Sequence, residues 1–132
     1  MRTSPIVKRL ESGEDRQVIE TFLTSESISR GDFVALDVTK TPDGDKALYI
    51  RKASTATDRT CVVGVAKTAA ASGAKLEVIV RGICEASVLA AAEGDALGVT
   101  GTQGAADTTT ATAVAYLLET AGAPGLFTVY VR

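Results

Sequence analysis

The sequence has no histidine and no tryptophan, and aromatic residues make up only 5% of it. Without histidine, the chain lacks the commonest general base and the commonest zinc ligand. It cannot build a Ser-His-Asp or Cys-His catalytic group from its own residues. No pair of carboxylates stands out for acid–base chemistry either. We therefore predict that the protein is not an enzyme and that it uses no metal ion and no cofactor.

Cysteine and long apolar runs are also scarce. Cys61 and Cys84 are 23 positions apart and form no C-x-x-C pair, which favours two reduced thiols packed as small apolar groups, with a disulfide as the alternative. No apolar run reaches about 18 residues, so we expect no membrane-spanning helix. Charged residues near the start leave no room for the apolar core of a signal peptide, and we expect none.

The chain carries 16 acidic and 14 basic residues, but they are unevenly distributed. Residues 31–82 hold eight basic and six acidic groups, whereas residues 83–132 hold five acidic groups and one basic group. The densest basic positions are Arg51, Lys52 and Arg59. This excess is too small for a nucleic-acid-binding surface. We expect neither nucleic acid nor membrane among the partners.

What the sequence does contain is a series of short strand signals within the length of one domain, 132 residues. Turn signals such as Gly31-Asp32 and Pro42-Asp43-Gly44 separate them. The predicted strands are 33–38, 47–51, 61–66 and 75–81. Segments 86–93 and 113–120 have helical composition but lie between turns, so we expect strands or short connectors there. The pattern predicts an all-β fold, a small β-barrel or sandwich of roughly eight short strands.

Two parts of the chain repeat one pattern. Residues 63–81 align with residues 114–132 without a gap, at an offset of 51. Upstream, Gly31-Asp32 matches Gly94-Asp95 at an offset of 63. We therefore predict an internal repeat with halves of about 27–82 and 83–132. We assign the 12 extra residues of the first half to the Pro42 hairpin and its returning strand.

Residues 1–26 differ from the rest because they are densely charged. Their sparse apolar residues are Ile6, Val7, Leu10, Val18, Ile19, Phe22 and Leu23. The spacing of the last four suits one face of a helix, but the β-branched side chains suit a strand. We favour an extended N-terminal arm with one strand near 17–23, followed by a β-barrel domain over 27–132. Such an arm either packs on its own domain or docks on a neighbour.

Three features together resemble the small capsid decoration, or cement, proteins of tailed bacteriophages. They are a Gly-Asp before a strand, the run Val62-Val63-Gly64-Val65-Ala66, and the alanine-rich turn leading into residues 76–82. The match covers about residues 27–100, with a weaker second copy to 132. The resemblance implies a small β-barrel that sits as a homotrimer on the outer capsid surface, with an N-terminal arm that adds to the sheet of a capsid subunit.

On this resemblance we expect a structural virion protein that binds the major capsid protein and stabilises the expanded head, assembled in the host cytoplasm. The seven apolar residues of the arm are the expected capsid contacts. The alternative is a surface- or carbohydrate-binding β module. The threonine-rich loop 107–112 favours that alternative, whereas the shortage of aromatic rings weighs against it.

Overall fold

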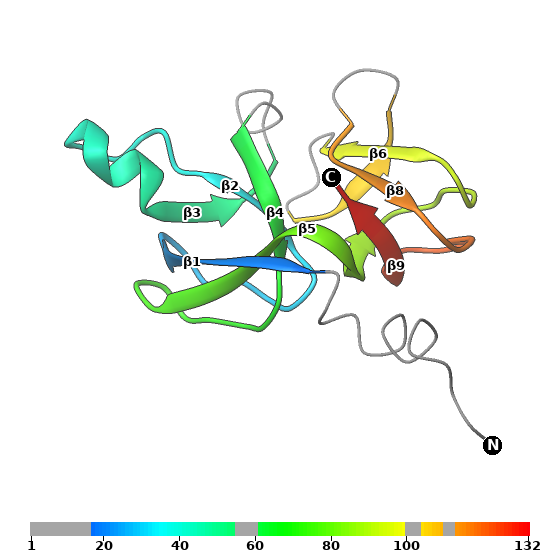
Figure 1. Cartoon of the computed structure of the whole chain (residues 1–132), viewed down its shortest axis with the longest axis horizontal. Helices are drawn as coiled ribbons and strands as arrows, with labels where there is room; N and C mark the ends of the chain where they lie inside the picture. Colours follow the sequence, from blue (N-terminus) through cyan, green and yellow to red (C-terminus); the bar gives the residue numbers. More distant parts are fainter. Residues whose placement is uncertain (1–16, 55–60, 100–103, 110–112) are drawn as a thin grey trace.

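The computed structural model describes residues 17–54, 61–99, 104–109 and 113–132 and confirms the all-β prediction. Figure 1 shows two lobes side by side, joined by one long bent strand, β5. The strands are β1 (Val18–Thr24), β2 (Phe33–Leu36), β3 (Tyr49–Lys52), β4 (Val62–Ala66), β5 (Lys75–Val88), β6 (Ala96–Val99), β7 (Ala106–Thr108), β8 (Ala115–Leu117) and β9 (Gly125–Val131).

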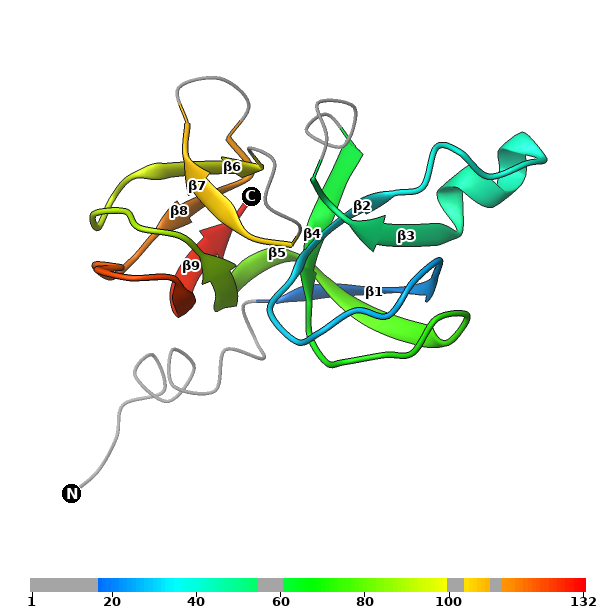
Figure 2. The same cartoon turned by 180° about the vertical axis from the view of Figure 1, so that it is seen from behind.

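In each lobe, the paired strands form a partial ring that begins and ends at β5. The first lobe consists of β1, β3, β2, β4 and the beginning of β5, and the second consists of the end of β5, β7, β6, β8 and β9. Some pairings are short: β4 pairs with β5 through two residue pairs, and β7 pairs with β5 through Val88 and Ala106. The arrangement is therefore sandwich-like and not one closed barrel (Figure 2).

The two lobes repeat the same strand pairings. Leu23 pairs with Lys75 in the first lobe as Ser87 pairs with Leu126 in the second. The same correspondence relates the β2–β3 pairing to β6–β7, and the β2–β4 pairing to β6–β8. By register, the second half of β5 is the counterpart of β1. A single strand thus ends one lobe and begins the other.

The Gly-Asp turns that revealed the repeat in the sequence have the same geometry. Gly31 has φ +89° and Gly94 has φ +85°, a left-handed conformation that favours glycine. Asp32 accepts a hydrogen bond from the backbone N–H of the residue three positions earlier at 2.9 Å, and Asp95 does the same at 2.8 Å. Two isolated bridges, Ile28–Ala70 and Ala91–Ala121, close the corresponding loops.

The repeat differs from the sequence prediction in two respects. The returning strand after Pro42 is not an insertion, because β3 has a counterpart in β7. The extra residues lie instead in the connections on either side of β3. In addition, the strand expected near 17–23 is present, and it packs on its own domain. As β1 it pairs with β5 through six residue pairs, so the first lobe begins within the segment assigned to the arm.

Two buried clusters form the core. The smaller cluster lies within the first lobe and includes Val34, Ile50, Leu76 and Val78. The larger cluster fills the second lobe but also takes residues from the first: Phe33, Ala35, Ala53 and Val65. All four are fully buried. The lobes therefore share one apolar core.

Several local predictions need correction. The strand predicted over 75–81 continues to Val88, into the segment 86–93 for which a strand or short connector was expected. Ile79, which interrupts the alternation of apolar and polar residues in this strand, is 4% exposed and pairs with Ile19 of β1 and Val65 of β4. The turn after Pro42 is a 3-10 helix over Asp43–Ala47 and not a tight reversal. In contrast, the preference for two packed thiols is confirmed: Cys61 and Cys84 form no disulfide, and both pack against the larger core.

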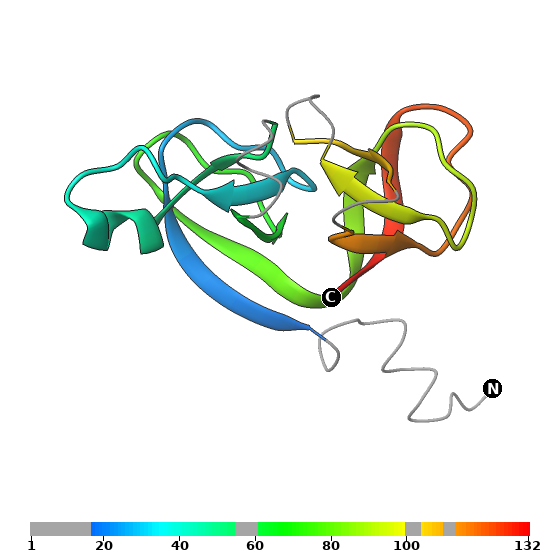
Figure 3. The ribbon, with the colours of Figure 1, turned by 90° about the horizontal axis from the view of Figure 1, so that it is seen from above.

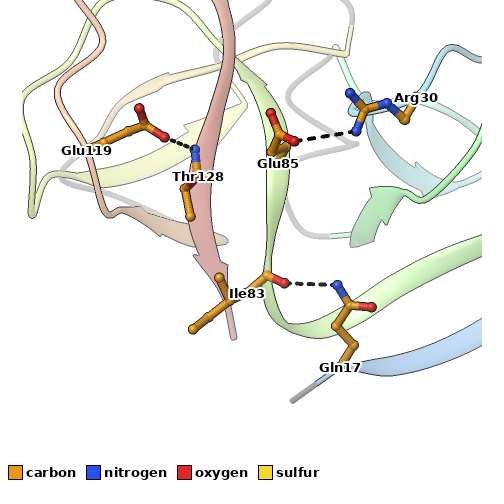
Figure 4. Close-up of polar contacts among 6 residues, drawn as sticks. All are labelled: Gln17, Arg30, Ile83, Glu85, Glu119 and Thr128. Carbon is orange, nitrogen blue, oxygen red and sulfur yellow. Dashed lines mark hydrogen bonds and ion pairs between the residues drawn. The ribbon is translucent and has the colours of Figure 1, made fainter. Parts of the chain in front are cut away.

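The lobes are also joined by the turn Arg30-Gly31-Asp32, named here the Arg30 turn. The Gly31 carbonyl accepts a hydrogen bond from the Ser87 N–H at 2.8 Å, and the Gly104 carbonyl accepts one from the Phe33 N–H at 2.8 Å. The Arg30 guanidinium lies 3.8 Å from the Glu85 carboxylate (Figure 4). Viewed from above, β5 bends where it passes from one lobe to the other, and the lobes stand side by side (Figure 3).

Candidate functional site

The structure places four of the seven predicted contact residues, since Ile6, Val7 and Leu10 lie outside the described residues. Val18 is 51% exposed at the start of β1, whereas Ile19 and Leu23 are partly buried. Phe22 packs against the smaller core. Val18 is thus the most accessible of the four, and Phe22 stabilises its own lobe.

The segment that precedes β1 joins the molecule at the waist between the lobes. The Gln17 side-chain amide donates a hydrogen bond to the Ile83 carbonyl at 3.0 Å (Figure 4). Val18 then pairs with Arg81, next to Gly82, which pairs with Val131 near the end of β9. The first described residues, Gln17 and Val18, therefore lie at the centre of the molecule.

An exposed apolar face lies beside this waist on the second lobe. Tyr130 pairs with Ile83 of β5 and with Tyr116 of β8, so three large side chains lie in one row across the sheet. Leu126 on the same strand face is 40% exposed, and Leu118 is 46% exposed. Tyr130 itself is 39% exposed. A group of exposed large apolar residues is typical of a protein-contact surface.

Polar contacts hold the edges of this face. The Glu119 carboxylate accepts a hydrogen bond from the Thr128 N–H at 2.8 Å, which lowers the pKa of this exposed carboxyl (Figure 4). Arg132 donates a hydrogen bond to the Tyr116 hydroxyl at 2.8 Å, and its guanidinium lies 5.6 Å from the centre of that ring. These contacts fix the orientation of side chains that the sequence shows only as scattered polar residues.

Three further findings bear on other functions. Among residues 17–54, 61–99, 104–109 and 113–132, no three His, Cys, Asp or Glu side chains gather as a metal site would require. The same residues contain no helix long and apolar enough to cross a membrane. An open cleft of about 310 Å³ lies beside Asp95, Ala96, Thr108 and Thr109, next to the loop considered for carbohydrate binding.

Comparison with known proteins identifies the class of molecule to which this fold and its exposed face belong. A family model described as phage cement protein matches residues 13–132, which includes every strand described above. The chain is a structural protein of the phage head. Specifically, it belongs to the phage cement protein family.

A solved structure shares the fold. It is described as the N base of the head fiber gp8.5 in bacteriophage phi29. The TM-score is 0.57 at 20% sequence identity, and the match covers 88% of this chain and 94% of that one. A comparison with curated proteins finds no match.

Proposed function

We propose that this protein binds the outer surface of a phage capsid, with the major capsid protein as its partner, and stabilises the expanded head. In this proposal the protein is a homotrimer without catalytic activity, and it is added to the head in the host cytoplasm. The observation that carries the proposal is the cement-family match over residues 13–132.

The proposed contact is the N-terminal segment together with the exposed apolar face next to it. Ile6, Val7 and Leu10 precede Gln17 in the sequence, and Gln17 lies at the waist. An extended segment can add to a sheet edge on the capsid, where backbone hydrogen bonds give affinity and side chains give specificity. Several weak contacts per trimer then act together, because each bound subunit raises the effective concentration of the others.

The direct test is cosedimentation of the purified protein with capsids of the phage that encodes it. Immature and expanded capsids are compared, and the amount of pelleted protein is measured against added protein. We expect saturable binding to expanded capsids at a fixed ratio per capsid subunit, and a higher melting temperature of the decorated heads. The absence of binding to both kinds of capsid would contradict the proposal.

The N-terminal contact is tested by deletion of residues 1–16, which leaves β1 intact. We expect the shortened protein to keep its circular dichroism spectrum and melting temperature but to bind capsids at least tenfold more weakly. A triple variant, Ile6→Asp, Val7→Asp and Leu10→Asp, separates apolar contact from chain length. Lys8→Ala is its control. Undiminished capsid binding by the deletion variant would place the contact elsewhere.

The cleft beside Thr108 and Thr109 supports a second candidate function. In that case the protein would be a carbohydrate-binding module. A glycan array distinguishes the two functions. Selective glycan binding that Thr108→Ala abolishes, together with no capsid binding, would favour the second function.

A further inference from the structure

The repeat provides an internal model for a contact between copies. Within the chain, the Arg30 turn docks on a surface of the second lobe. That surface consists of five residues: Glu85, Ala86, Ser87, Gly104 and Leu126. Glu85 forms the ion pair with Arg30, and the Ser87 N–H binds the Gly31 carbonyl. A side chain added at Gly31 would collide with Leu126, so the glycine lies directly against it.

The counterpart surface on the first lobe is an open groove. The strand registers map Glu85, Ala86, Ser87 and Leu126 to Thr21, Phe22, Leu23 and Lys75. The fifth residue, Gly104, lies two positions before Ala106, as Leu48 lies two positions before its counterpart Ile50. The five counterpart residues of the first lobe line a cleft of about 170 Å³, named here the β1 groove. Leu48 is 53% exposed at its rim. The first lobe therefore has the docking surface without a turn seated on it.

On the second lobe, no other segment of the described chain lies against the glycine of the counterpart turn. This turn is Glu93-Gly94-Asp95, named here the Glu93 turn, and its glycine has the same left-handed backbone as Gly31. A Cβ added at Gly94 would have no neighbour within 4 Å. One lobe thus presents a free turn, and the other presents a free groove of the matching kind.

The charges of the turn and of its docking surface both differ between the two lobes. In the chain, the basic Arg30 faces the acidic Glu85. In the counterpart pair, the acidic Glu93 would face Thr21, whose hydroxyl can donate to a carboxylate. Lys75 replaces Leu126 and would lie beside Gly94, between Glu93 and Asp95. An acidic turn thus meets a groove with a lysine at its rim, whereas a second Arg30 turn would meet that lysine unfavourably.

Docking of a turn in the β1 groove also requires a change of hydrogen-bond partners. In the first lobe the Leu23 N–H donates to the Leu48 carbonyl at 2.8 Å. In the second lobe the corresponding groups, the Ser87 N–H and the Gly104 carbonyl, bind the Arg30 turn and Phe33 instead. Docking of a turn in the β1 groove would replace one internal hydrogen bond with two bonds to the partner. Leu48 stands where Gly104 lies. A Cβ at Gly104 would lie 2.8 Å from the Asp32 carboxylate, so the partner's Asp95 must take a different position over Leu48.

We infer that the Glu93 turn of one copy docks in the β1 groove of a second copy. This inference rests on the self-association proposed above and specifies its contact. Because the turn and the groove lie on different lobes, the contact is head-to-tail. Such contacts form a closed ring where the rotation permits, and a ring of three copies would match the proposed trimer.

Charge reversal tests the contact in solution by sedimentation velocity. Lys75→Glu and Glu93→Lys change exposed side chains and are expected to leave the fold intact. Each should weaken self-association roughly three- to tenfold per contact, since an exposed ion pair is replaced by a repulsion of similar size. The double variant restores the opposite charges and should recover the wild-type value. Lys67→Glu, outside the groove, is the charge-matched control.

Cross-linking between two different chains provides the second measurement. One chain carries Thr21→Cys and the other Glu93→Cys, both with Cys61 and Cys84 replaced by serine. We expect a disulfide-linked dimer when the two chains are mixed and oxidised, in solution or on capsids, and none from Lys67→Cys with Glu93→Cys. No dimer in either setting, or no rescue by the double charge reversal, would overturn the contact. Capsid pelleting of the same chains tests the proposed function separately.

Discussion

At the residue scale, Asp37 is the most tightly held carboxylate in the described structure. It is 4% exposed, and it accepts hydrogen bonds from the Ser25 hydroxyl at 2.6 Å, the Thr39 N–H at 3.1 Å and the Thr39 hydroxyl. Burial by itself raises the pKa of Asp37, but these hydrogen bonds and the nearby Arg51 outweigh it, so the net pKa is lowered. The folded protein therefore favours the charged form.

Replacement of Asp37 should change how stability depends on pH. Because the folded pKa is lowered, the stabilisation is complete above the ordinary aspartate pKa, about 3.9, and is lost as pH falls through the folded value. Asp37→Asn should lower the unfolding free energy by about 1–3 kcal/mol at pH 7. The difference from wild type should shrink toward pH 3. Urea unfolding at both pH values measures this, with Asp45→Asn as control. A pH-independent difference would contradict the assignment.

The environment of Cys84 explains why its thiol packs in the core and is not reactive. Burial raises its pKa to about 12, and the Glu85 charge adds to the shift. The reactive thiolate is therefore scarce at neutral pH. This agrees with the sequence-based preference for a packed thiol over a chemical role.

At the scale of the element, the crossing of β4 and β5 depends on Gly64. A Cβ at this position would overlap the Ile79 carbonyl and lie 2.8 Å from its carbon. Both are backbone atoms, so the strands themselves must move apart. The counterpart residue in the second lobe is Ala115, where a Cβ is present and fully buried.

The two counterparts form a matched pair of substitutions. Gly64→Ala should destabilise the protein by about 1–3 kcal/mol, because overpacking forces a backbone shift. Ala115→Gly removes a buried methyl group without a clash and should cost about 1 kcal/mol. Chemical denaturation of both variants gives the comparison. An equal or smaller loss for Gly64→Ala would show that β4 adapts to the side chain.

The strands with strong sequence signals were predictable, and the others were not. Leu76, Val78 and Val80 alternate with polar residues except at Ile79, and this alternation is the signature of a half-buried strand. The continuation of β5 through Gly82 and Cys84 has no such alternation, and its pairing with β9 across more than 40 residues decides its conformation. Ala106-Asp107-Thr108 has poor strand composition, so β7 and its correspondence to β3 were missed.

At the scale of the whole molecule, the lobes should unfold together. Phe33 belongs to the first lobe by sequence but is fully buried in the core of the second. Phe33→Ala should therefore destabilise both lobes, by about 3–5 kcal/mol. Tyr49→Trp and Tyr116→Trp supply a unique fluorescent probe in each lobe, since the chain has no tryptophan. Both probes should report one transition. Separate midpoints would show independent lobes.

The repeat was readable from the Gly-Asp turns and the two fixed offsets. The candidate contact surfaces were not. The Arg30 turn, Glu85 and Leu126 come together through the bend of β5, which no local pattern encodes. The correspondence between the occupied surface and the β1 groove follows from strand registers, and registers depend on pairings between distant residues.

The shared strand β5 also determines how the molecule would carry force. If separate partners hold the two lobes and pull them apart, the tension runs along β5. Its ladders with β1 and β9, six and seven residue pairs long, are then loaded in shear, so that many hydrogen bonds share the load and must break nearly together. A linker between two separate domains would extend first. The shared strand therefore makes the molecule a stiff connection between its attachment points.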